Sequence, residues 1–164
     1  MRIRLLSVGR RMPAWVNDGF AEYAKRLPAA ECALELVEID PGRRGSGRGK
    51  ASAADLDRIR RDEGERILKA LPDGALAVAL DVRGRPWSTE QLAEQLTAWL
   101  GSGRDVALLV GGPDGLADTC LARAELRWSL SPLTFPHALV RVILAEQLYR
   151  AWSVTKGHPY HRAG

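Results

Sequence analysis

The feature of this sequence that most constrains its fold is a pair of short, uninterrupted apolar runs. Residues 75–80 read Ala-Leu-Ala-Val-Ala-Leu, and residues 106–110 read Val-Ala-Leu-Leu-Val. Runs of this length are too short to span a membrane and are typical of strands that are covered on both faces of a parallel sheet. Between them, Ser88 and Gln91 are spaced for a capping box at the start of a helix. We therefore expect a parallel sheet with helices on both faces.

Other strands and helices alternate along the rest of the chain. Hydrophobic periodicity predicts further strands at 3–8, 33–39 and 126–130, and further helices at 13–27, 52–71, 118–124 and 136–152. Five strands interleaved with five helices indicate an α/β fold with a mostly parallel sheet. Because 164 residues suit one hydrophobic core and no repeat or linker is evident, we expect a single domain over residues 1–164.

The net charge of +4 becomes informative once its distribution along the chain is considered. Residues 43–50 carry +4 through Arg43, Arg44, Arg48 and Lys50, and residues 137–164 carry +3, which leaves −3 on the rest of the chain. We expect the Gly/Arg-rich residues 42–50 to form a mobile loop. Two basic zones on a slightly acidic body predict a directed contact with a polyanion such as RNA, and a solvated surface is the alternative.

Several function classes lack their motifs here. The sequence contains neither a Gly-Lys-Ser/Thr triphosphate loop nor a Gly-x-Ser-x-Gly elbow, and we expect no metal because no cluster of ligands stands out. Cys32 and Cys120 lie far apart without a Cys or His partner at metal spacing, which argues against a disulfide framework or a structural zinc. Met1-Arg2-Ile3-Arg4 leads into a strand rather than a signal peptide. We expect a cytoplasmic protein without membrane contact.

Three segments follow predicted strands at the edge where parallel sheets bind ligands. They are residues 80–84, the glycine loop 111–115 (Gly-Gly-Pro-Asp-Gly), and residues 130–136 (Leu-Ser-Pro-Leu-Thr-Phe-Pro). The glycines either let the backbone approach a ligand or form a tight turn. The prolines predict a rigid, extended loop whose backbone groups suit an adenine edge.

The last 28 residues hold all three histidines, His137, His158 and His161. Within the last helix, the four-residue spacing of Glu146 and Arg150 favours an ion pair along the helix. The ending 157–162, with Tyr, two His and Arg, is typical either of a disordered tail or of a segment that stacks on a base and binds phosphate.

Several motifs together carry a family resemblance. They are residues 8–13, 62–65 (Asp-Glu-Gly-Glu), 111–116, 128–131, 133–137, 139–151 and 158–161. Their order and content resemble the RlmH (YbeA) family of SPOUT-class methyltransferases over nearly the whole chain. The sequence differs from the family in a longer Arg/Gly/Ala-rich stretch around residues 43–54 and in Ala163-Gly164 at its end.

The resemblance implies transfer of a methyl group from S-adenosylmethionine to N3 of a pseudouridine in 23S ribosomal RNA within the ribosome. It also implies a homodimer with a C-terminal trefoil knot, for which periodicity gives no sign. Carried over by position, the cofactor contacts fall on the same three strand ends identified above. These residues are Leu80, Gly111, Leu130, Ser131, Pro132, Leu133, Thr134 and Phe135.

We expect His137 to act as the base that removes the N3 proton, with His158 and His161 as rivals and a packing role as the alternative. Arg141 and Arg162 complete the predicted catalytic set, and with Arg150 they would hold phosphates or uracil carbonyls. Predicted RNA contacts are Arg43, Arg44, Arg150, His158, Tyr160 and His161. The alternatives are a ribosome-binding factor without catalysis and a methyltransferase for a small molecule.

Overall fold

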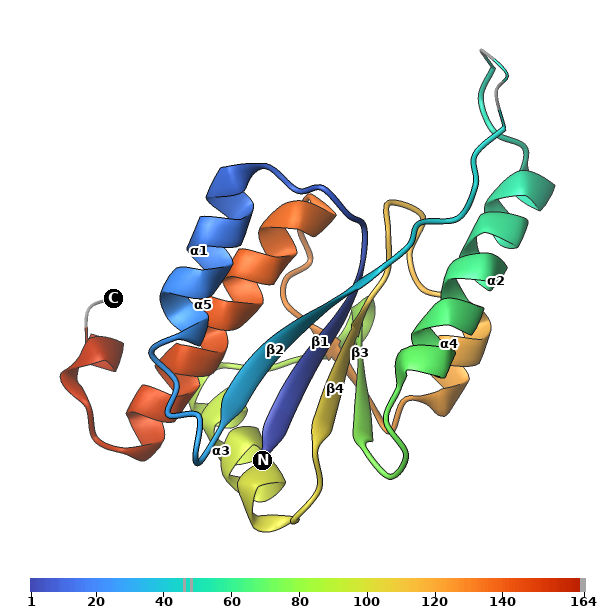
Figure 1. The fold of residues 1–164 in the computed structure, drawn as a ribbon. Coiled ribbons are helices and arrows are strands. Elements are labelled where there is room, and N and C mark those ends of the chain that lie inside the picture. The colour runs from blue at the N-terminus through green and yellow to red at the C-terminus, as the bar shows by residue number, and fades with distance from the viewer. Residues whose placement is uncertain (46, 48, 163–164) are drawn as a thin grey trace.

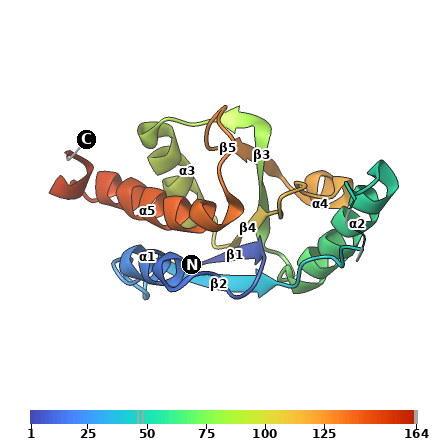
Figure 2. The same cartoon turned by 90° about the horizontal axis from the view of Figure 1, so that it is seen from above.

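A five-stranded parallel sheet forms the centre of the computed structural model, which describes residues 1–45, 47 and 49–162. Its strands are β1 (Arg2–Val8), β2 (Ala33–Ile39), β3 (Leu76–Pro86), β4 (Val106–Val110) and β5 (Leu126–Ser129). Their order is β2-β1-β4-β3-β5, and every neighbouring pair is parallel; Figure 1 labels the first four strands of this order, and Figure 2 labels all five. The predicted α/β fold is therefore confirmed.

Helices cover both faces of this sheet (Figure 2). One face packs against α1 (Ala14–Ala24), α3 (Thr89–Gly101) and α5 (His137–Thr155), and the other against α2 (Ala53–Ala70) and the short α4 (Asp118–Arg123). A 3-10 turn, η1 (Pro159–Arg162), follows α5. The predicted capping box of Ser88 with Gln91 forms, and the structure shows a second one, of Ser52 with Asp55. None of the described helices is long and apolar enough to cross a bilayer.

The two apolar runs are buried on both faces, as expected. In β4, Leu108 belongs to the cluster under α1, α3 and α5, whereas Ala107 and Leu109 belong to the cluster under α2 and α4. All five residues of β4 are buried. This burial fixes the central strands, so the loops at their carboxyl ends start from a rigid base.

β3 is longer than the apolar run that predicted it. The strand continues past Leu80 to Pro86, because the chain bulges and then pairs again with β5, where Arg85 and Leu80 both face Trp128. The bulged residues lie at the ligand edge of the sheet.

The described residues of 42–50 form neither helix nor strand, and Arg48, Ala163 and Gly164 lie outside the described residues. The trefoil knot stays a prediction.

Candidate active site

A cavity of about 310 Å³ lies at the carboxyl ends of β3, β4 and β5. We call it the cofactor cleft. Its walls come from all three strand-end segments and from the start of α5. The lining residues are Leu80–Val82, Val110–Pro113, Gly115, Leu116, Trp128, Leu130, Ser131, Leu133–Phe135, His137 and Val140. Seven of the eight predicted cofactor residues thus lie together, and Pro132 is exposed beside them.

Local hydrogen bonds shape the two loops of the cleft. The Gly115 N–H donates to the carbonyl of Gly112 at 3.0 Å, which closes the glycine loop into a turn. In the second loop the Leu133 N–H donates to Ser131 Oγ at 3.0 Å. The Leu133 side chain is 71% exposed and stands at the rim. The backbone of both loops is therefore held in place by the loops themselves.

Asp81 is a polar residue of the cleft that we did not select from the sequence. Its Oδ1 accepts from the Arg83 N–H at 3.1 Å, whereas its Oδ2 is buried and has no hydrogen-bond partner among the described residues. A buried carboxylate oxygen without a partner is costly, so a ligand group that donates to it would be stabilised. Its position directly after an apolar strand was the available signal.

His137 begins α5 and forms one wall of the cleft. Burial, together with the positive charge of Arg141, lowers the pKa of its half-buried imidazole. Gly9 lies beside both groups: a Cβ atom there would be 3.5 Å from His137 Nε2 and 3.4 Å from Arg141 Nη2. The same atom would clash with Met12 Cε at 2.5 Å, and φ is +121°. Glycine thus allows β1 to approach the start of α5.

Arg141 is in a different environment from the one that we expected. Its side chain is 0% exposed; Nε donates to Ser7 Oγ at 3.1 Å, and Nη2 donates to the Gly9 carbonyl at 2.8 Å. Nη1 pairs with Glu38 at 3.0 Å. These donors are turned into the protein and not toward solvent, so the expected grip on a phosphate or uracil does not fit this geometry. We correct its role to one of joining β1 and β2 to α5 behind His137.

The other C-terminal residues lie in the second half of α5 and in the segment that follows it. Arg150 pairs with Glu146 at 2.7 Å, which confirms the predicted ion pair, and the Tyr160 hydroxyl donates to Glu146 at 3.0 Å. Burial, aided by Glu146, raises the pKa of Tyr160 to about 12. His158, His161 and the exposed Arg162 lie in this same ending. We call these residues, Glu146, Arg150 and 158–162, the tail cluster.

The length of α5 separates the tail cluster from the cofactor cleft. The helix has 19 residues, and at 1.5 Å per residue its ends are roughly 28 Å apart. Within one chain, Arg162 therefore does not approach His137, and the predicted catalytic set is divided. Sequence reasoning missed this separation because both residues lie within the same short C-terminal segment.

The Gly/Arg-rich stretch 42–50, which we call the basic loop, contacts the glycine loop through Arg44. Its guanidinium pairs with Asp114 of the glycine loop at 2.7 Å. Arg43 is exposed, and its carbonyl accepts from Arg58 at 3.3 Å. One of the two predicted RNA contacts in this zone is thus joined to the glycine loop, and the other is open to solvent.

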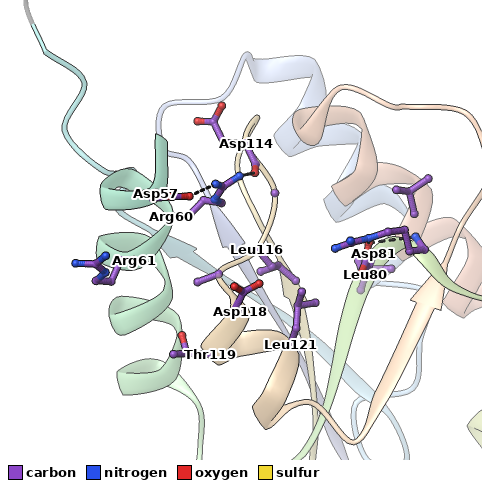
Figure 3. Close-up of a pocket in the computed structure, with 14 residues that line it drawn as sticks. Asp57, Arg60, Arg61, Leu80, Asp81, Asp114, Leu116, Asp118, Thr119 and Leu121 are labelled. Carbon is purple, nitrogen blue, oxygen red and sulfur yellow. Dashed lines mark hydrogen bonds and ion pairs between the residues drawn. The ribbon is translucent and has the colours of Figure 1, made fainter. Parts of the chain in front are cut away.

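A second, polar cavity of about 650 Å³ adjoins the cofactor cleft (Figure 3). The two cavities share Leu80–Val82, Gly115 and Leu116. In Figure 3, Asp81 on β3 and helix α2, where Arg60 pairs with Asp57, lie on opposite sides of this space. Arg60 also donates to the Asp114 carbonyl at 3.3 Å. The cofactor cleft therefore continues into a groove of mixed charge.

Two further features of the described residues concern clusters of metal ligands and the two thiols. Residues 1–45, 47 and 49–162 contain no group of three or more His, Cys, Asp or Glu placed to hold a metal ion. Burial raises the pKa of both Cys32 and Cys120 to about 11, so these thiols stay protonated and are poor nucleophiles.

Comparison with known proteins identifies the family. A family model described as a predicted SPOUT methyltransferase matches residues 1–161. The chain belongs to the SPOUT methyltransferase family. Two curated relatives of this SPOUT methyltransferase carry the name ribosomal RNA large subunit methyltransferase H. The protein of Thioalkalivibrio sulfidiphilus is 62% identical over 99% of both chains, and that of Alkalilimnicola ehrlichii is 64% identical over 99% of this chain and 100% of its own.

A solved structure supports the fold at lower identity. A probable methyltransferase from Bordetella pertussis superposes with a TM-score of 0.56 at 17% identity, covering 92% of this chain and 95% of that one. At this identity the likeness extends to the fold alone. The family resemblance drawn from the motifs is confirmed by the matches to the family model and to the curated relatives.

Proposed function

We propose that this SPOUT methyltransferase transfers a methyl group from S-adenosylmethionine to N3 of a pseudouridine in 23S ribosomal RNA. The observation that carries the proposal is the cofactor cleft, where three strand ends meet His137. Relatives 62% and 64% identical over almost their whole length are named for methylation of large-subunit ribosomal RNA. We infer from this substrate that the protein acts in the cytoplasm, with the ribosome as its partner.

The cleft fits S-adenosylmethionine in size and in chemistry. Pockets for small molecules and cofactors typically start at roughly 300 Å³ and combine apolar walls with a few polar groups, and this cleft has about 310 Å³. Trp128, Leu130 and Phe135 supply apolar wall, and Asp81 adds a carboxylate to the lining, which suits a ribose hydroxyl or an ammonium group. When bound, S-adenosylmethionine supplies an electrophilic methyl group on a sulfonium.

His137 is the residue that we assign to the proton at N3. Its lowered pKa keeps the imidazole neutral at pH 7, the state in which it accepts a proton. Base catalysis of this kind contributes about 10²- to 10⁴-fold in rate. The rigid loops contribute by orientation, since holding two reactants in an aligned geometry is worth up to roughly 7–11 kcal/mol. Arg141 fixes the start of α5 and hence the imidazole.

A homodimer would reconcile the two ends of α5 with one RNA substrate. By the rise of 1.5 Å per residue, Arg150 lies roughly 20 Å along the helix from His137, and the end of the helix, which 158–162 follow, lies roughly 28 Å away. A second copy packed in the opposite direction would bring its Arg162 and Tyr160 to the cleft of the first. We therefore propose that the protein acts as a homodimer with Arg150, His158 and His161 on the RNA side.

The test uses S-adenosylmethionine with a labelled methyl group and 70S ribosomes, free large subunits or naked ribosomal RNA. The proposal predicts label at N3 of one pseudouridine in 23S RNA, found by mass spectrometry of the digested RNA. A His137→Gln variant serves as the control for label that does not depend on the cleft. Ribosome binding without label, and without uptake of S-adenosylmethionine in calorimetry, would instead identify a non-catalytic ribosome-binding factor. Label found only in small molecules would exclude an RNA substrate.

A further inference from the structure

The carboxyl group of Glu63 is buried in the middle of α2, outside the cofactor cleft. Glu63 as a whole is only 4% exposed to solvent. Oε1 accepts from the Gly42 N–H at 3.0 Å, and Oε2 is buried with no hydrogen-bond partner among the described residues. Burial raises the pKa of this carboxyl, which favours its neutral form. An apolar residue of the same size would avoid the cost of the unpaired oxygen.

Both oxygens of Glu63 lie against the glycine loop of the cleft. A Cβ atom on Gly112 would be 3.4 Å from Oε2, 3.5 Å from Oε1 and 3.2 Å from Val8 Cγ1. Gly112 itself lines the cofactor cleft. Glu63 therefore lies next to the side of Gly112 where a side chain would stand, although its own side chain is not in the cleft lining.

The same carboxyl also contacts the start of the basic loop. Gly42, which donates to Oε1, is the residue before Arg43. Farther along both loops, Arg44 pairs with Asp114 at 2.7 Å. The ion pair thus joins the two loops directly, and Glu63 lies between them, bonded to Gly42 and beside Gly112.

We propose that Glu63 is a positioning residue that holds the Gly111–Gly115 loop in its binding shape and ties it to the base of the basic loop. The inference deepens the proposed function and rests on it for the identity of the ligand. Glu63 acts through Gly112 and Gly42, and takes no part in the transfer itself. Its expected signature is a loss of cofactor affinity out of proportion to any loss of stability.

The experiment compares Glu63→Ala and Glu63→Gln with Glu65→Gln, an exposed residue of the same helix. Hydrogen exchange of the ligand-free protein reports on the loop through the Gly115 N–H, which is bonded to Gly112. Glu63→Ala should speed this exchange about tenfold and weaken S-adenosylmethionine binding about tenfold in calorimetry. Glu63→Gln keeps the acceptor for Gly42 and should stay within threefold of the native protein in both, as should Glu65→Gln.

Native exchange at Gly115 in a folded Glu63→Ala protein would overturn the proposal. So would an affinity loss shared equally by Glu63→Ala and Glu65→Gln. If the native protein binds no S-adenosylmethionine, the proposed function fails, but faster exchange in Glu63→Ala still supports the positioning role. The two failures are therefore distinguishable.

A second pair of variants covers the case in which Glu63→Ala does not fold. Gly112→Ala should weaken cofactor binding about tenfold, because the added methyl lies 3.2 Å from Val8 Cγ1 and also meets the Glu63 oxygens at 3.4 and 3.5 Å. In a Glu63→Asp background the carboxyl withdraws while Val8 stays in place, so the same methyl should cost less than in the native protein without becoming neutral. Such non-additivity is the mark of two groups in contact. Equal costs in both backgrounds would overturn the proposal.

Discussion

The two ends of α5 use the same residue types in opposite ways. At the cleft end Arg141 is 0% exposed and satisfied by internal acceptors, and it stands behind the histidine that lines the cleft. At the tail end Arg150 is partly exposed, pairs with Glu146 on its own helix, and lies 5.1 Å from the Tyr160 ring centre. One arginine belongs to the core, and the other is available at a surface.

This difference teaches that charge alone does not locate the RNA contact. The basic C-terminal zone carries +3 in the sequence, but the charge of Arg141 is shared with Glu38 inside the protein. The charge that RNA can reach therefore belongs to the tail cluster, not to the cleft end. We expect the cleft end to control turnover and stability, and the tail end to control RNA affinity.

The largest expected effect is that of His137→Gln on turnover. Loss of the base should lower kcat by about 10²- to 10⁴-fold, while S-adenosylmethionine affinity stays within about threefold. The measurement is single-turnover methylation with saturating cofactor, beside His158→Gln and His161→Gln, which change the rival bases at the other end of α5. Near-normal turnover in His137→Gln, with a large loss in either rival, would move the base to the tail cluster.

The second prediction concerns stability. Arg141→Met removes a buried cation and leaves Ser7, Gly9 and Glu38 without their donor, so the free energy of unfolding should fall by about 3 kcal/mol. Arg150→Met breaks a helix-surface pair and should cost about 1 kcal/mol or less. Chemical denaturation of both variants measures the contrast. Similar losses at the two arginines would remove the distinction between the ends.

How far the sequence could predict this molecule follows from the range of the interactions involved. Apolar runs and capping boxes are local signals, so β4 was predicted with its observed bounds, and the three strand-end segments identified from the sequence line one cavity. The pairing of Arg141 with Ser7 spans 134 positions. No local pattern carries it, and the same arginine was predicted to face RNA.

The position of the tail cluster and the role of Asp81 could not be predicted from the sequence, for related reasons. Residues 137 and 162 are close in sequence, but a straight helix keeps them apart. Asp81 became noticeable only when its Oδ2 proved to be buried without a partner among the described residues. The bulge that places it depends on pairing between β3 and β5, which a single sequence does not reveal.

The third prediction is a pH dependence at the cleft end. Because folding lowers the pKa of His137 below its ordinary value of about 6.5, the folded chain binds fewer protons there than the unfolded chain as the pH falls. The contribution of His137 to stability is thus lost on acidification through and below that value. Turnover should fall over the same acidic range, because the base becomes protonated.

Arg141 gives this pH dependence a direct control. Its positive charge is one of the two causes of the lowered pKa, so Arg141→Met should move the acidic limb of the pH–rate profile to higher pH. Arg150→Met, at the other end of α5, should leave the limb where it is. A limb that does not respond to Arg141 would show that another group sets it.

The smallest expected effect is on the salt dependence of RNA binding. Each lost phosphate contact should reduce the slope of log K against log salt by about 0.7 to 0.9. Arg162→Gln, which changes an exposed arginine of the tail cluster, should therefore lower the slope by roughly one contact and leave cofactor affinity within twofold. Lys69→Gln, an exposed cation outside both basic zones, is the matched control and should not change the slope.

Arg44→Gln should have a weaker effect than Arg162→Gln, since Asp114 already neutralises Arg44 at 2.7 Å. An equal loss of slope at Lys69 would mean that the whole surface attracts RNA, and the contrast between the two ends of α5 would then have no bearing on where the substrate binds.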